Sequence, residues 1–303
     1  MNGDEMQPRI KELAKARNAV ILAHNYQPPE IQDLADMCGD SLELSRRAAR
    51  TDAEVIVFCG VHFMAETASI LCPQKTVLLP RMDAGCLMAD MITAEALQIK
   101  IDSLPPMPVV TYVNSTADVK ALSTICCTSA NVIQVVESLE AGEMLLTPDR
   151  NLAMYAASRT SKKIHVWEGY CPTHEWLRPE DVQKSRTEHP KAVFIAHPEC
   201  RPEILAMADV IASTSGMLRH AAQSEHQEFI VGTENGLLYP LRKANPGKRF
   251  YPASERMICR NMKKISPADV LHSLENMAGE VKVPEEIRLP AYQAVERMIA
   301  LNM

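Results

Sequence analysis

The chain has 303 residues, of which 47% are hydrophobic and 23% charged, and its net charge is −6. These values are typical of a folded globular protein and exclude a disordered one. The sequence has no block of lysine or arginine and only 5% aromatic residues, which argues against a nucleic-acid partner.

No apolar run approaches the roughly 20 residues that a membrane-spanning helix needs. The N-terminal residues do not combine a basic flank with a hydrophobic segment, so the sequence predicts no secretory signal and no membrane association. We therefore expect a cytoplasmic protein whose nine cysteines are reduced thiols, available for metal binding or catalysis.

Short aliphatic runs alternate along the chain with stretches of helical period, for example at 31–35, 42–49 and 132–139. Apolar runs that end in polar side chains start at Val20, Val109 and Val193, which are 89 and 84 residues apart. Alternating strands and helices predict parallel sheets buried between helix layers.

Three further landmarks keep the same period, which indicates an internal repeat. A turn with a hydroxyl side chain recurs at Ser41, Ser129 and Ser213-Thr214, and further apolar runs follow Glu54, Glu143 and Glu228. Runs that begin at Lys75, Lys163 and Lys248 lead to Cys86, Cys171 and Cys259, which are 85 and 88 residues apart.

The period predicts three similar three-layer α/β domains in a pseudo-threefold arrangement around a central site, at residues 1–87, 88–172 and 173–260. A helical tail follows at 261–303, and Ser266-Pro267 is typical of a helix start. We expect this tail to pack on the first or the third domain, with the first preferred.

One cysteine per domain suggests three thiolates that meet at the centre. Zinc sites usually take four ligands, often from C-x2-C pairs, and the chain contains no such pair. A cubane iron-sulfur cluster held by three cysteines has one iron without a protein ligand, and such an iron can act as a Lewis acid. Without the repeat, ordinary buried thiols would be the better interpretation, and we keep it for the other six cysteines.

Polar side chains follow the first strand of each domain, where open α/β sheets bind ligands. They are His24 with Tyr26, Tyr112 with Asn114, and His197 with Glu199. Ser41, Ser129, Ser213 and Thr214 precede helices, where hydroxyls serve as helix caps and can also bind anions. His174 follows Cys171 in a C-x-x-H sequence, and we expect it to contact substrate or sulfide more than a metal.

These residues together resemble the quinolinate synthase family. The matching segments cover nearly the whole chain and include His24-Asn25-Tyr26-Gln27, Gly39-Asp40-Ser41-Leu42, Asp83-Ala84-Gly85-Cys86, Tyr112-Val113-Asn114-Ser115, His197-Pro198-Glu199-Cys200, Gly232-Thr233-Glu234 and Cys259-Arg260-Asn261-Met262.

The resemblance implies condensation of iminoaspartate with dihydroxyacetone phosphate to quinolinate, with loss of phosphate and two waters, in NAD biosynthesis. It implies a 4Fe-4S cluster on Cys86, Cys171 and Cys259, and a partner, aspartate oxidase or dehydrogenase, that supplies iminoaspartate. Glu199 would be the acid/base residue, assisted by Tyr26 and His197, with a pKa raised by burial.

The same resemblance implies that Tyr112 and Asn114 position the carbon skeleton. Carboxylate and phosphate groups would then contact His24, Ser41, Ser129, Ser213 and Thr214. Some family members carry C-x2-C-x2-C at the third cysteine, whereas Arg260-Asn261-Met262 follows Cys259 here, so a regulatory disulfide at this place is in doubt.

Two other enzyme classes share the arrangement of one cysteine in each of three domains. They are the radical enzymes of diphthamide synthesis and a diphosphate reductase of isoprenoid synthesis, and neither matches the His-Asn-Tyr and His-Pro-Glu segments. A binding or scaffold protein that encloses a small anion, with inert cysteines, is the alternative that is not an enzyme.

Overall fold

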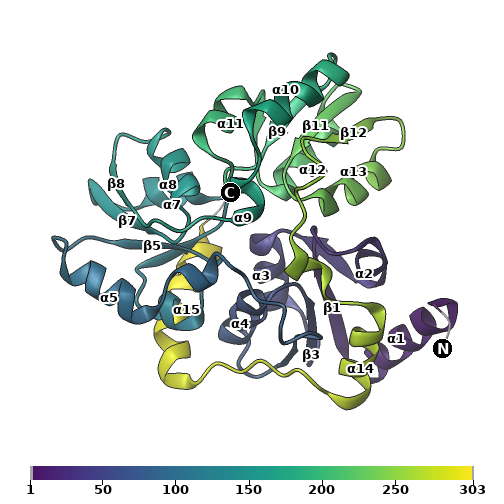
Figure 1. Ribbon diagram of the computed structural model, residues 1–303. Helices are drawn as coiled ribbons and strands as arrows, with labels where there is room; N and C mark the ends of the chain where they lie inside the picture. Colours follow the sequence, from purple (N-terminus) through teal and green to yellow (C-terminus); the bar gives the residue numbers. More distant parts are fainter. Residues whose placement is uncertain (1–2, 302–303) are drawn as a thin grey trace.

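The computed structural model describes residues 3–301; the two residues at either end of the chain, which belong to the predicted first domain and to the tail, lie outside the described part. The chain forms three parallel four-stranded sheets with the orders β2-β1-β3-β4, β6-β5-β7-β8 and β10-β9-β11-β12 (Figure 1). Each sheet takes its strands from one sequence repeat, and all three share one order. The prediction of three similar α/β units is confirmed, while their boundaries remain a proposal.

The elements of the first unit are α1 (Gly3–Ala16), β1 (Ala19–His24), α2 (Pro29–Leu34), β2 (Met37–Gly39), α3 (Ser41–Arg50), β3 (Val55–Cys59), α4 (His62–Leu71), β4 (Thr76–Leu78) and the 3-10 turn η1 (Ala89–Met91). Those of the second are α5 (Ala94–Asp102), β5 (Val109–Tyr112), α6 (Ala117–Ala121), β6 (Ile125–Cys127), α7 (Val132–Ser138), β7 (Glu143–Thr147), α8 (Arg150–Ala157) and β8 (Lys163–Val166).

The elements of the third unit are α9 (Pro172–Glu175), α10 (Pro179–Glu188), β9 (Val193–Ala196), α11 (Pro202–Met207), β10 (Val210–Ile211), α12 (Thr214–Gln223), β11 (Glu228–Gly232), η2 (Asn235–Leu237), α13 (Leu238–Ala244) and β12 (Arg249–Pro252). The tail holds η3 (Arg260–Lys263), α14 (Pro267–Asn276) and α15 (Glu285–Ala300).

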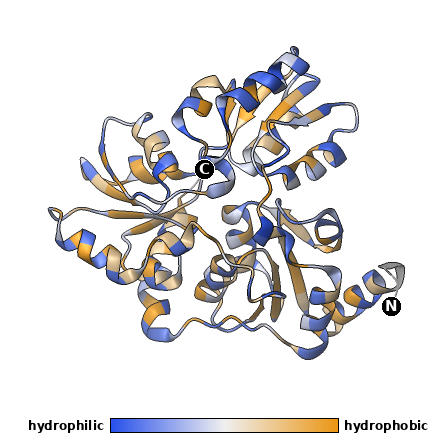
Figure 2. Ribbon diagram, viewed as in Figure 1, coloured by the Kyte–Doolittle hydropathy of each residue, from blue (hydrophilic) through white to orange (hydrophobic). Residues whose placement is uncertain are grey.

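Each unit has three layers because right-handed crossovers place its helices on both faces of the sheet. In the first unit α3 packs against α4, while α1 and α2 contact α14. The two central strands of each sheet are buried on both faces, as all five residues of β3 are, whereas the edge strands β8, β10 and β12 are partly exposed. Figure 2 shows the apolar residues on the strands and the polar residues on outward sides of the helices.

No helix within residues 3–301 is both long and apolar enough to cross a bilayer.

The hydroxyl turns differ in their capping roles. Ser213 caps α12 by accepting the N–H of Gly216, as predicted. The cap of α3, however, is Asp40, whose carboxylate accepts the N–H groups of Leu42 and Glu43, and Ser41 is the first helical residue. A carboxylate can accept both N–H groups at once, so the Ser41 hydroxyl is left free of the capping role.

The tail packs on more than the predicted unit. α14 contacts α1, α2 and β3 of the first unit, whereas α15 contacts α6 and β6 of the second unit as well as α3 and α4 of the first. The apolar face of α15, which buries Ala291, Ala294, Val295 and Met298, therefore covers the junction of the two units. Periodicity within α15 predicts a buried face without indicating its partner.

The sheet order places a crevice at the carboxyl ends of the first and third strands of each unit. From β1 the chain turns to one side through α2, and from β3 it turns to the other through α4. Open α/β sheets bind ligands at such a reversal point. The three units surround a common centre in Figure 1.

Candidate functional site

The strand register identifies equivalent positions in the three units. The last residue of the third strand pairs with the first strand in each unit, as Cys59 with Ala23, Thr147 with Thr111, and Gly232 with Ala196. The residues that come next along the chain are therefore equivalent: His24 and Tyr112, which end β1 and β5, and His197, which directly follows β9. Two residues further on, one phenol, one amide and one carboxylate occupy equivalent positions: Tyr26, Asn114 and Glu199.

A cavity of about 450 Å³ is lined by Cys86, Cys171 and Cys259, one from each repeat. Each cysteine directly precedes a helical turn, whose backbone N–H groups act to lower the pKa of the thiol: Met88 and Ala89 at Cys86, His174 at Cys171, and Asn261 and Met262 at Cys259. Such N–H donors stabilise a thiolate over a thiol.

Burial opposes these donors and keeps the free thiols protonated. It raises the pKa of Cys86 to about 12 and also raises the pKa of Cys171 and of Cys259. Glu199 and, to a smaller extent, the other two thiols raise the pKa of Cys171 further, and all three cysteines line the same cavity. Three partly buried thiols that line one cavity fit an iron-sulfur cluster, because cluster iron replaces their protons.

The predicted polar residues line a second, smaller cavity of about 40 Å³. It shares Tyr26, Asn114 and Glu199 with the cysteine cavity, and its walls include His24, Ser41, Tyr112, Ser129, His197 and Thr214. Ser213 is not in this wall, because its hydroxyl donates to Asp40 at 3.2 Å. Among the described lining residues there is no lysine or arginine.

Glu199 lies between the two cavities and is 3% exposed. Its Oε2 is 2.8 Å from His174 Nδ1 and 3.3 Å from His197 Nδ1. Burial by itself would raise the pKa of Glu199, but the two imidazoles outweigh burial and lower it below its usual value. The predicted rise of this pKa is therefore wrong, and the carboxylate is the favoured form.

A chain of hydrogen bonds continues from Glu199 to the first unit. His174 Nε2 lies 2.8 Å from the Thr233 hydroxyl, which in turn lies 2.5 Å from the Tyr26 hydroxyl. His174 is 1% exposed, and its Nδ1 also lies 3.2 Å from Cys171 Sγ. The sequence analysis left Thr233 without a role, although the family resemblance includes the segment that contains it.

Burial shifts four other groups of the small cavity, two imidazoles and two phenols, towards their uncharged forms. Burial and nearby His197 lower the pKa of His24 to about 3, and burial lowers the pKa of His197. Burial and Glu199 raise the pKa of Tyr26 and of Tyr112 well above the usual value. The wall thus offers imidazole, phenol and hydroxyl groups as hydrogen-bonding partners, beside the carboxyl group of Asp40.

Two buried carboxylates hold the cysteine loops. Asp149 accepts the backbone N–H of Cys171 at 3.2 Å, and Glu234 accepts that of Cys259 at 3.1 Å. Both lie two residues beyond the third strand of their unit, where the first unit has Val61. This pair is not among the residues predicted from the sequence, although the equivalent positions of the repeats indicate it.

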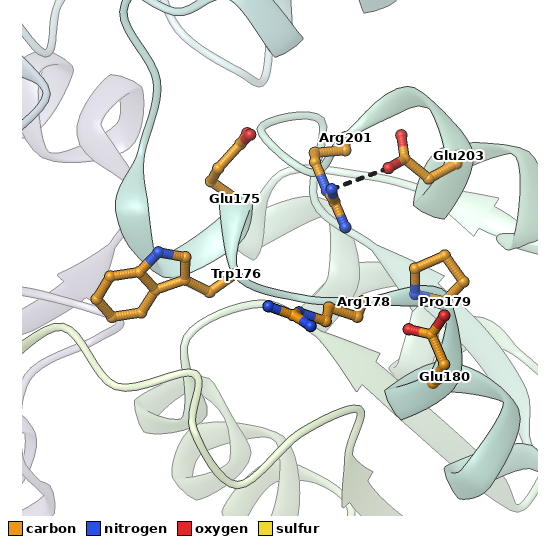
Figure 3. A pocket seen from close by; sticks show the side chains of 7 residues that line it. All are labelled: Glu175, Trp176, Arg178, Pro179, Glu180, Arg201 and Glu203. Atoms are coloured by element: carbon orange, nitrogen blue, oxygen red, sulfur yellow. Dashed lines mark ion pairs between the residues drawn. The ribbon is translucent and has the colours of Figure 1, made fainter.

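A further pocket of about 480 Å³ opens beside the cysteine cavity (Figure 3). Trp176, which is 68% exposed, lines both. The described residues of this outer pocket include an Arg201–Glu203 ion pair but no thiol or imidazole. Glu175 connects the outer pocket to the region of Glu199. The side-chain amide of Asn151 donates hydrogen bonds both to the Glu175 carboxylate and to the backbone carbonyl of Glu199.

The fold and the site define a class: α/β enzymes of three diverged units, in which each unit contributes one thiol and one polar strand end to a shared centre. The family model for "Quinolinate synthetase A protein" matches residues 8–300. The chain belongs to this family.

Several relatives are similar over their whole length. A protein named quinolinate synthase from Geotalea uraniireducens is 56% identical over 301 residues, which is 99% of each chain. Quinolinate synthase 1 from Methanosarcina acetivorans is 54% identical over all of both chains. Quinolinate synthase from Dehalococcoides mccartyi strain CBDB1 is 56% identical over 96% of each.

Proposed function

We propose that this enzyme condenses iminoaspartate with dihydroxyacetone phosphate to form quinolinate in NAD biosynthesis, with release of phosphate and two waters. The observation that supports it most is the junction of the two cavities, where Glu199, Tyr26 and Asn114 lie between three thiols and a wall of imidazole, phenol and hydroxyl groups. The names of the relatives agree with this reaction.

Cys86, Cys171 and Cys259 would hold a 4Fe-4S cluster as part of this proposal. With three thiolates, one iron has no protein ligand, and the bound cluster would supply a Lewis acid for an oxygen of the substrate.

Both substrates are anions, and the wall of the small cavity would hold a carboxylate or phosphate group without lysine or arginine, while the adjoining cavity of about 450 Å³ would hold the rest of the substrate. The hydroxyls of Ser41, Ser129 and Thr214 line it, and α12 begins at Thr214, so the positive end of this helix dipole adds to the attraction. Ser213 would act indirectly, by tying the start of α12 to Asp40. Tyr112 and Asn114 would position the carbon skeleton, and the Oδ1 atom of Asn114 is buried without a partner within residues 3–301.

Glu199 would accept protons during condensation, isomerisation and dehydration. A carboxylate whose charged form is favoured is available as a base, and both imidazoles beside it can take the proton onward. Tyr26 connects to this group through Thr233 and His174, and its protonated hydroxyl can donate to a developing oxyanion.

The proposal includes a cytosolic location and a partner, aspartate oxidase or dehydrogenase, that supplies iminoaspartate. Both are predictions from the sequence resemblance.

An anaerobic assay of quinolinate formation from the two substrates tests the proposal. We expect turnover by the wild-type protein and none by Cys171→Ala, with Cys72→Ala as the matched control because Cys72 is buried in the core of the first unit. Absence of quinolinate with an intact cluster, or full activity of Cys171→Ala, would contradict it.

A further inference from the structure

Three side chains at the wall of the cysteine cavity form a compact set of metal ligands that differs from the set of three thiols. The ligand atoms of Cys171, His174 and Glu199 all lie within 4.8 Å of one another. We propose that the protein without its cluster binds one divalent cation such as Zn²⁺ at these three residues, as a mononuclear site.

The distances suit a single ion. His174 Nδ1 is 3.2 Å from Cys171 Sγ and 2.8 Å from Glu199 Oε2. Zinc binds sulfur at about 2.3 Å and nitrogen or oxygen at about 2.0 Å, so a tetrahedral ion requires ligand atoms roughly 3.2–3.6 Å apart. Shifts of a few tenths of an ångström would open the site for the ion.

Two independent features point to a ligand. Glu199 is buried, and its Oε1 has no hydrogen-bond partner in the described part of the chain. The other ring nitrogen of His174 contacts the Thr233 hydroxyl at 2.8 Å, which orients the ring so that Nδ1 faces the thiol and the carboxylate. Metal-binding histidines characteristically have such an outer partner.

Charge also favours a divalent ion. A thiolate from Cys171 and a carboxylate from Glu199 carry two negative charges, which one divalent cation neutralises in a buried place. All three ligands line the 450 Å³ cavity, so a water molecule there can complete the coordination. Sulfur, nitrogen and oxygen ligands in one set favour zinc, cobalt or iron(II) over magnesium or calcium.

The single ion and the cluster exclude each other, because both use Cys171 Sγ. Binding of the ion releases the thiol proton and requires no change of oxidation state. We therefore expect Zn²⁺ to inhibit cluster assembly, and this expectation does not depend on the reaction that the enzyme catalyses.

Titration with Co²⁺, a coloured substitute for Zn²⁺, tests the site in full-length, cluster-free protein kept without oxygen. We expect one Co²⁺ per chain, with a thiolate-to-metal absorption band. His174→Gln should weaken binding by more than about 100-fold, and Thr233→Val by about 10–100-fold, the usual cost of losing an outer partner.

Cys259→Ala is the matched control. It removes a thiol of the predicted cluster but none of the three ligands, so it should keep the Co²⁺ band and lose the ability to assemble a cluster. His174→Gln should lose the Co²⁺ band and still assemble a cluster. Because each variant keeps one of the two functions, the comparison also shows that both variants are folded. Unchanged Co²⁺ affinity in His174→Gln, or loss of the band in Cys259→Ala, would overturn the proposal.

Zn²⁺ supplies a second readout. Added before iron and sulfide, it should slow cluster assembly in the wild-type protein and much less in His174→Gln. Equal inhibition of the two proteins would also overturn the proposed site.

Discussion

Glu199 is the residue on which most of the proposed chemistry depends. Its equivalents in the other units, Tyr26 and Asn114, cannot act as a carboxylate base, and the other carboxyl group of the small cavity, that of Asp40, is engaged as the cap of α3. We expect Glu199→Gln to keep the iron content and to reduce quinolinate formation by about 10²–10⁴-fold, the usual contribution of an acid/base group. Anaerobic assays with iron analysis measure both quantities.

Glu203→Gln is the control for that variant. Glu203 lies four residues after Glu199 and lines the outer pocket. Its side chain is 47% exposed and forms an ion pair with Arg201. The Glu203→Gln variant should keep its activity within about twofold of the wild-type value, because surface ion pairs contribute little to stability. Turnover by Glu199→Gln close to the wild-type rate would remove Glu199 from its proposed role.

His24 should make the stability of the protein depend on pH. Its pKa is about 3 in the folded protein and 6.5 ordinarily, so below pH 6.5 the unfolded chain binds a proton that the folded chain does not. This contribution to stability is complete above pH 6.5 and declines as the pH falls, by about 1.4 kcal/mol per pH unit. Between about pH 6.5 and pH 5 the loss is then about 2 kcal/mol.

Chemical unfolding at several pH values checks this expectation. His24→Gln should reduce the slope of stability against pH, whereas replacing the exposed His226 with Gln should leave it unchanged. An equal slope in His24→Gln and in the wild-type protein would contradict the buried, neutral state of His24.

At the scale of elements, α14 shows how far local sequence determines structure. Ser266 accepts the N–H of Asp269, the Asp269 carboxylate accepts the N–H of Ser266, and Pro267 begins the helix. All the parts of this start lie within four residues, so the sequence predicts it. The packing of α15 on the second unit depends on contacts distant in sequence, and periodicity could not predict it.

Ser266→Ala should lower the free energy of unfolding by about 1 kcal/mol, because the first turn of α14 loses its cap. Ser266→Thr, which keeps the hydroxyl, should recover most of this loss. Denaturant unfolding of the three proteins is the measurement. Equal stability of Ser266→Ala and the wild-type protein would mean that the cap contributes nothing to the fold.

At the scale of the molecule, the repeat predicted three sheets, and the structure has them with one strand order. The period also selected the three cysteines of the large cavity and most of the residues of the small one. It could not predict individual side-chain contacts, either within a unit, such as those of His174 with Glu199 and Thr233, or between units, such as that of Thr233 with Tyr26, because these depend on how distant segments are oriented. The lowered pKa of Glu199 follows from those contacts.

Because each unit supplies one cysteine, removing any one should have the same effect. We expect anaerobically prepared protein to contain about four irons per chain. Cys86→Ala, Cys171→Ala and Cys259→Ala should each lose most of this iron, while Cys72→Ala should retain it. Iron analysis with the visible spectrum is the measurement. Retention of iron in any of the three variants would contradict the predicted ligand set.

The equivalence of Tyr26, Asn114 and Glu199 has a consequence for orientation. A ring of three identical units would present the same groups on every side, and a ligand at its centre could bind in three indistinguishable ways. In a single chain the three positions can differ, and here they offer a phenol, an amide and a carboxylate. A substrate with unlike ends can then distinguish the three directions, so that one of its atoms consistently faces the base.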